Sequence, residues 1–189
     1  MTDRHDDTHV RADRTLHEAY ALPLDEIVDT RAAAPLNASI DAWDVPAEDR
    51  AALRRWGLPA QIKERFFENA PQHGAAPELS RPGRNLYRLG RFNRLTIGVE
   101  EGTGKVTALP RDAAAPDIGF NRSLTRYIEC AWRWHAALPV LIELANWAWE
   151  PDQLDFYERQ RQAVRRHIAA IDPDAASDAS SLWQAIIDI

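Results

Sequence analysis

The sequence predicts an α+β fold, in which an antiparallel β-sheet of about four or more strands is flanked by N-terminal and C-terminal helices. Two patterns support this class. Apolar residues follow the helical period of about 3.6 in the first and last thirds of the chain. Between residues 86 and 120, short apolar runs alternate with polar or small residues and are separated by glycines and prolines, which is typical of half-buried strands joined by turns.

The N-terminal region begins with a polar segment. Residues 1–12 contain too little apolar surface to pack, so we expect a mobile tail, followed by a single domain over residues 13–189. A short helix is expected around Leu16 and Tyr20. The sequence has no secretory signal core and no apolar run of the ~20 residues that a membrane span needs, which predicts a cytoplasmic protein.

A clearer helix is expected from Pro46, whose fixed φ suits the first helical position. It should end at Gly57, because glycine commonly follows the last residue of a helix. A second short helix is predicted over residues 61–68, with its apolar side chains toward the core. The composition of residues 69–83 predicts a loop.

The middle of the chain is expected to form strands around residues 86–89, 95–99, 106–109 and 118–120. The turn before the third of these reads GTGK, like the end of a phosphate-binding loop. Such a loop also needs an earlier glycine, where this sequence has Val99, and a hydroxyl residue after the lysine, where it has Val106. Because β-rich runs flank the two glycines, we predict a hairpin turn rather than a nucleotide site.

The best-defined helix is expected from Leu124, capped by Asn121 or Ser123. Pro139 should kink or break it, because proline lacks the amide donor. The face that carries Arg133 is expected to be solvated. The opposite, apolar stripe consists of Leu124, Tyr127, Ile128, Ala131, His135, Leu138 and Ile142.

Two more helices are predicted, one after Pro151 and a short one after the loop at residues 171–180. Their apolar residues are Leu154, Tyr157, Val164 and Ile168 in the first, and Leu182, Trp183, Ile186 and Ile187 in the second. The chain has seven tryptophans, most of which we expect in the core. One or two left partly exposed would be suitable interface anchors.

Composition and motifs argue against several functions. The net charge of −6 argues against a general binder of nucleic acid or anionic membranes, because such a binder needs clustered Lys and Arg. An acidic surface that attracts a basic partner remains possible. The single cysteine, Cys130, excludes an internal disulfide, and it lies roughly 140° from His135 around an ideal helix. We therefore predict no catalytic, cofactor-binding or metal-binding residues.

Four segments occur in an order that is more informative than any one of them. They are GLP at residues 57–59, LYRLGRFNRLTIGVEEGTGKVTAL at 86–109, FNRSLTRYIECAW at 120–132, and IDPDAASDASSLWQAIIDI at 171–189. Over roughly residues 44–189 this order resembles the SUKH superfamily of bacterial immunity proteins, most closely its fourth subgroup. FNRS departs from the family's usual F-V-N-S-S, which affects the subgroup more than the fold.

The resemblance implies an antiparallel sheet backed by helices, and no catalytic residues. It also implies a function, which is to bind and neutralise a toxin of a polymorphic or contact-dependent toxin system by occlusion. Toxins paired with this superfamily are often nucleases or nucleic-acid deaminases, so a basic toxin is the expected partner. The oligomeric state stays open.

Acidic residues at the predicted hairpin tip and in the next loop are the candidate toxin-binding residues, namely Glu100, Glu101, Asp112 and Asp117. The alternative interpretation is that these carboxylates belong to an ordinary solvated hairpin and bind no partner. Two other functions compete with immunity: a regulatory or scaffold module of the same fold with no toxin partner, and a hydrolase using His135, Cys130 and a distant carboxylate.

Overall fold

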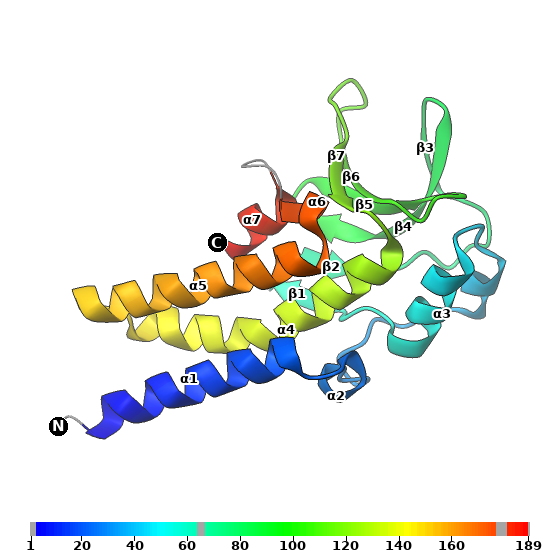
Figure 1. Ribbon diagram of the computed structural model, residues 1–189. Coiled ribbons are helices and arrows are strands. Elements are labelled where there is room, and N and C mark those ends of the chain that lie inside the picture. The colour runs from blue at the N-terminus through cyan, green and yellow to red at the C-terminus, as the bar shows by residue number, and fades with distance from the viewer. Residues whose placement is uncertain (1–2, 64–66, 177–180, 189) are drawn as a thin grey trace.

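The structure joins a twisted antiparallel sheet to a layer of helices, which confirms the α+β class (Figure 1). This computed structural model describes the backbone of residues 3–63, 67–176 and 181–188. Within that part of the chain, the helices lie along one side of the sheet, and the long ones extend well beyond it (Figure 1).

The sheet has seven strands in the order β1-β2-β4-β5-β6-β7, with β3 pairing beside β2 on the same edge of β4. All the paired strands are antiparallel. Their bounds are Gln61–Lys63 (β1), Phe67–Asn69 (β2), Leu79–Arg81 (β3), Arg84–Phe92 (β4), Leu95–Glu100 (β5), Val106–Pro110 (β6) and Ile118–Asn121 (β7). The four strands predicted in the middle of the chain are therefore confirmed as β4 to β7.

The predicted hairpin turn is also confirmed. β5 and β6 pair in register, and Gly104 donates its backbone N–H to the carbonyl of Glu100 at 3.0 Å. Gly102 and Gly104 have φ of 78° and 73°, a region that favours glycine. Both glycines therefore have a conformational role in the turn.

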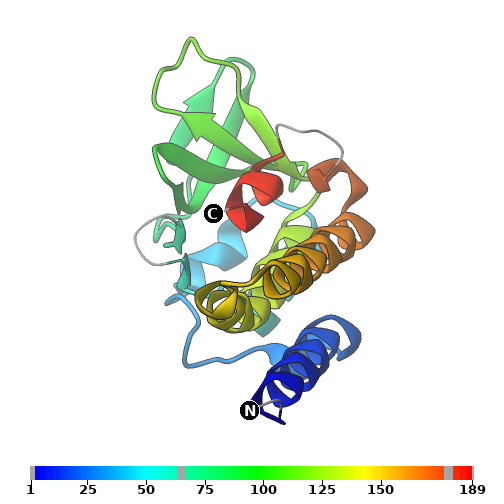
Figure 2. The same ribbon diagram turned by 90° about the vertical axis from the view of Figure 1, so that its left-hand side faces the viewer.

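The helices are α1 (Asp3–Ala21), α2 (Leu24–Ile27), the 3₁₀ helix η1 (Ala38–Ala42), α3 (Ala47–Trp56), α4 (Leu124–Trp147), α5 (Pro151–Ile171), α6 (Pro173–Ala176) and α7 (Leu182–Ile187). α4 is central and contacts α1, α3 and α5. Figure 2, which views the molecule from the far ends of α1, α4 and α5, shows these three helices side by side. None of the helices in the described ranges is both long and apolar enough to cross a membrane.

Of the segment predicted as a second helix, residues 61–63 form β1 and residues 67–68 belong to β2, while residues 64–66 lie outside the described part of the chain. The prediction was wrong because Phe67 and its neighbours pair with β4, placing Phe67 opposite Phe92. Tertiary pairing outweighs weak local propensity in such a short segment. The following loop is also shorter than predicted, since Leu79–Arg81 pairs with β4 as β3.

The N-terminal helix is longer than the short helix predicted around Leu16 and Tyr20. α1 begins at Asp3, inside the segment expected to be a tail, and buries Ala12 and Leu16. The mobility of residues 1–12 and the boundary after them stay predictions, and residues 1–2 lie outside the described part of the chain.

The helix ends follow the local signals. α3 ends before Gly57 as predicted, and Gly57 has a φ of 61°; Pro46, predicted as the first helical residue, is instead the residue before Ala47. Ser123 is the cap of α4, since its side chain accepts a hydrogen bond from the backbone N–H of Arg126 at 3.3 Å. Pro139 does not break α4, which runs on to Trp147.

Arg133 corrects the expected solvated face of α4. It is only 8% exposed, and its Nη1 donates to the carbonyls of Ala19 (2.9 Å) and Leu22 (3.2 Å). These carbonyls lie at and just beyond the C-terminal end of α1, where helix carbonyls lack partners within the helix. Arg133 therefore holds α1 against α4.

The core lies between the sheet and the helices, and its buried tryptophans are Trp43, Trp132, Trp134 and Trp183. Phe67 lies among four aromatic rings, with centroid distances of 5.7 Å to Phe92, 6.1 Å to Phe120, 6.3 Å to Trp183 and 6.5 Å to Tyr127. This cluster joins β2, β4, β7, α4 and α7, so it connects the sheet to both helical regions.

Candidate functional site

The hairpin predicted to carry toxin-binding carboxylates is held firmly against the helices. The backbone N–H of Gly102 donates to the carbonyl of Asp44 at 2.7 Å. A Cβ at Gly104 would lie 2.0 Å from Oδ2 of Asp49, so only glycine fits there. Oδ1 of Asp49 in turn accepts from the backbone N–H (2.8 Å) and hydroxyl (2.7 Å) of Thr125 in the first turn of α4.

Two of the four predicted carboxylates converge on one arginine. Arg84 forms ion pairs with Asp117 and, at 3.9 Å, with Glu100. Arg81 also pairs with Asp117 at 3.2 Å. The side chains of Glu100 and Asp117 are only 17% and 12% exposed. Much of the negative charge expected at this surface is therefore neutralised by neighbouring cations.

The other two predicted carboxylates lie apart from this cluster. Glu101 accepts a hydrogen bond from Nδ2 of Asn85 at 3.0 Å and one from the Tyr87 hydroxyl at 3.4 Å. Asp112 is exposed, and its Oδ1 accepts from the backbone N–H of Ala114 at 3.0 Å. Of the four, Asp112 is the most open to an approaching molecule.

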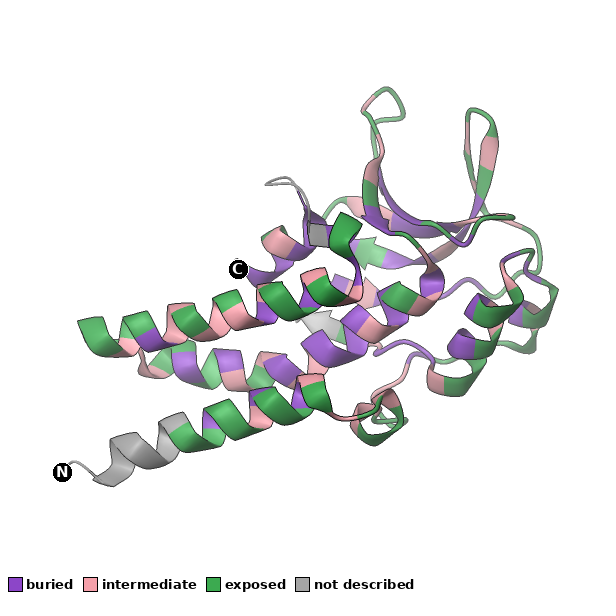
Figure 3. Cartoon of the chain, viewed as in Figure 1, coloured by how far each residue is buried: buried purple, intermediate pink, exposed green. Residues whose placement is uncertain are grey.

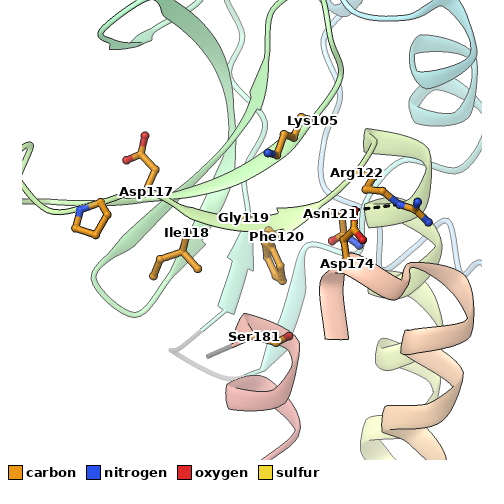
Figure 4. A pocket seen from close by; sticks show the side chains of 10 residues that line it. Lys105, Asp117, Ile118, Gly119, Phe120, Asn121, Arg122, Asp174 and Ser181 are labelled. Atoms are coloured by element: carbon orange, nitrogen blue, oxygen red, sulfur yellow. Dashed lines mark ion pairs between the residues drawn. The ribbon is translucent and has the colours of Figure 1, made fainter. Parts of the chain in front are cut away.

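A pocket of about 390 Å³ lies beside β7, and its lining includes β7, Asp174 of α6, and Lys105 and Ser181, which directly precede β6 and α7 (Figure 4). An ion pair between Arg122 and Asp174 (3.6 Å) crosses one side of it. Asp117, on another side, is paired with Arg81 and Arg84. The charged side chains that line the pocket are therefore of both signs and largely paired.

Asn121 and Arg122, which line this pocket, also belong to a buried polar network that joins two of the sequence segments that carry the resemblance. Asp172 is fully buried and accepts from Nδ2 of Asn121 (3.1 Å), and from the backbone N–H (2.8 Å) and Nε (3.1 Å) of Arg122. Nε1 of Trp183 donates to Oδ1 of Asn121 at 3.0 Å. FNRS and the DP…W segment therefore share a structural role, which is to attach the C-terminal helices to the end of β7.

The residues of the hydrolase hypothesis are not arranged for catalysis. Cys130 is fully buried, and burial, with Asp172 and Glu129 nearby, raises the pKa of its thiol. Nδ1 of His135 lies 3.2 Å from the carbonyl of Gln61, and its ring packs edge-on against Trp132. His135 is half-buried rather than at the centre of the core. Among the described residues, no three His, Cys, Asp or Glu side chains are grouped as metal ligands.

Sequence reasoning did not identify the most exposed aromatic side chain. Trp149, between α4 and α5, is 84% exposed. Ile142 and Leu154, predicted as core residues of these two helices, are 50% and 55% exposed. The sequence signal was the excess of tryptophan itself, which could not show which ring lies outside the core.

The comparisons with known proteins agree with the resemblance. The family model for the SUKH-4 immunity protein matches residues 11–188. The match begins well before residue 44, where the resemblance was expected to start, and so includes most of α1. No curated protein and no solved structure matches the chain. Since the family model covers nearly the whole chain, the protein belongs to the SUKH-4 immunity protein family.

Proposed function

We propose that this protein binds and neutralises a cognate toxin of a bacterial polymorphic toxin system in the cytoplasm. Membership of the SUKH-4 immunity protein family is the observation that carries the proposal. The toxin would be a basic enzyme that acts on nucleic acid, a nuclease or a deaminase. The net charge of −6 supports such a partner, because an acidic protein associates quickly with a basic groove.

The proposed mechanism is occlusion without chemistry. The immunity protein would cover the toxin's active site or hold an inactive conformation, and would need no catalytic residue, cofactor or metal of its own. The buried Cys130 and the paired carboxylates of the hairpin support this view, because neither offers a reactive group to a substrate.

Co-expression tests the function directly. The toxin-like reading frame next to the gene is expressed with and without this protein, and growth is measured. We expect co-expression to restore growth and the two proteins to co-purify as a complex. A toxin that remains lethal and shows no complex would contradict the proposal and would favour a scaffold module that binds a host protein.

The four predicted carboxylates are one candidate contact surface for the toxin, and their charge can be tested separately. Replacing Glu100 and Glu101 with lysine is expected to slow association with the toxin several-fold and to reduce its salt dependence, because steering by charge is screened by salt. Stopped-flow association rates at two salt concentrations measure the effect.

A charge reversal at Asp112 serves as the companion variant. Asp112 is exposed and forms only a local hydrogen bond, whereas Glu100 and Glu101 also contact Arg84, Asn85 and Tyr87. Asp112→Lys should therefore slow association without lowering the melting temperature. Association rates that stay unchanged in both variants would remove the β5–β6 turn and the β6–β7 loop from the interface.

A further inference from the structure

The exposed apolar side chains of the described residues gather in one part of the molecule. Those that are large and exposed are Val10 (66%), Ile142 (50%), Trp149 (84%) and Leu154 (55%). They belong to α1, α4, α5 and the α4–α5 turn, in the part that extends away from the sheet (Figures 1 and 3). Residues 142–155, which include the α4–α5 turn, form the end of this extension. We call them the arm end.

Trp149 is held in one orientation although it is exposed. Its Nε1 donates to the carbonyl of Asn146 at 2.8 Å, and its backbone N–H donates to Oε1 of Gln153 at 3.0 Å. The first bond brings the ring back to the last turn of α4, one turn after Ile142. An aromatic side chain already fixed before binding loses little conformational entropy on binding, which is the property of an interface anchor.

Local structure does not explain this exposure. Trp149 and Leu154 occupy the positions before the cap and at the fourth residue of α5, where two apolar residues often pack as a hydrophobic staple. In this position Trp149 is nevertheless 84% exposed, which a structural role alone would not require.

Along the sequence, the charged residues nearest Trp149 are all acidic. Between Arg133 and Arg159 the sequence contains no lysine or arginine, but it contains Glu143, Glu150, Asp152, Asp155 and Glu158. Glu143 pairs with Arg11 and Glu158 with Arg161. Asp152 and Asp155 are exposed and form no ion pair with any of the described residues. The arm end therefore has two exposed carboxylates with no ion pair among the described residues, unlike Glu100 and Asp117, which pair with Arg84.

We propose that the arm end is the surface that anchors the basic toxin, with Trp149 entering an apolar hollow of the toxin and Asp152 and Asp155 facing its cations. This inference rests on the proposed function and specifies where the partner binds. The arm end and the hairpin lie at opposite ends of the molecule (Figure 1), so variants at the two surfaces test different interfaces.

The experiment measures binding of the purified toxin domain from the adjacent reading frame to the full-length protein by surface plasmon resonance. Trp149→Ala is expected to raise the dissociation rate at least about 10-fold, and Trp149→Phe to restore part of the loss. Asp152→Lys with Asp155→Lys should lower the association rate about 10-fold at low salt. Since these side chains are exposed, melting temperatures should change little.

A matched control separates local charge from net charge. Glu18→Lys with Glu26→Lys makes the same change in net charge at exposed positions of α1 and α2. This control should leave the association rate within about two-fold. Wild-type protein that binds the toxin, together with arm-end variants that bind within two-fold of it, would overturn the inference and leave the proposed function intact.

Two other outcomes are also decisive. If the wild-type protein does not bind the toxin domain, the proposed function fails and this inference fails with it. Self-association of the wild-type protein in analytical ultracentrifugation, lost in Trp149→Ala, would assign the arm end to a second copy of the chain and contradict a toxin contact.

Discussion

Asp172→Ala is expected to lower the free energy of unfolding by about 3 kcal/mol, because hydrogen bonds to a buried charge are strong and their loss leaves donors unpaired. Asp172 has no exposed surface and accepts from Asn121 and from two nitrogens of Arg122. Asn121 also accepts from Trp183, so the substitution weakens the attachment of α7 to β7. Urea denaturation followed by tryptophan fluorescence measures the change.

Asp174→Ala is the matched control for this prediction. Asp174 follows Asp172 by two residues and also contacts Arg122, at 3.6 Å, but its side chain is 67% exposed. We expect its removal to cost less than about 0.5 kcal/mol, as for other solvated ion pairs. Equal effects of the two substitutions would mean that the buried network does not stabilise the C-terminal helices.

Trp183→Phe extends the same test, since it removes the indole donor and keeps an aromatic ring. If Asp172, Asn121 and Trp183 act as one network, the combined variant should lose less stability than the sum of the two single variants. Additive losses would show instead that Asp172 and Trp183 stabilise the fold independently.

The elements that the sequence predicted correctly are those whose signals are local. Strands β4 to β7 follow from alternation and from glycines in the turns, and Gly57 marks the end of α3. Each signal involves residues within a few positions of one another. Their effect on the backbone does not depend on the rest of the fold.

The failures arose where a distant segment decided the structure. Residues 61–68 have an ambiguous pattern, and the pairing of Phe67 and Glu68 with β4 makes the end of this segment a strand. Arg133 shares a helical face with charged residues, yet it is buried because the end of α1 supplies carbonyls for its guanidinium. Neither partner is close in sequence, so periodicity could not predict either contact.

The candidate site shows the same limit. Glu100 and Asp117 were identified as acidic residues in turns, but the sequence could not show that Arg84 lies between them. Trp149 was one of seven similar residues, and only its exposure distinguishes it. Charge along the sequence is visible at once, whereas neutralisation and exposure depend on which segments meet in the fold.

Phe67→Ala is expected to cost about 4 kcal/mol in the free energy of unfolding, a typical loss when a fully buried aromatic ring is removed. Phe67 is 1% exposed and lies within 5.7–6.5 Å of Phe92, Phe120, Tyr127 and Trp183. These rings belong to β4, β7, α4 and α7. A cavity at Phe67 therefore weakens the packing between the sheet and the helices. Thermal and urea unfolding measure the loss.

Glu68→Ala is the control for this variant, because Glu68 lies on the same strand with its side chain 47% exposed and paired with Arg91 at 3.0 Å. A solvated pair contributes little, so we expect a loss below about 1 kcal/mol. The two neighbours should therefore differ several-fold, as successive residues of a strand with one buried face do. If Phe67→Ala were as mild as Glu68→Ala, β2 would not bury this face, and the aromatic cluster could not be what joins the sheet to α4 and α7.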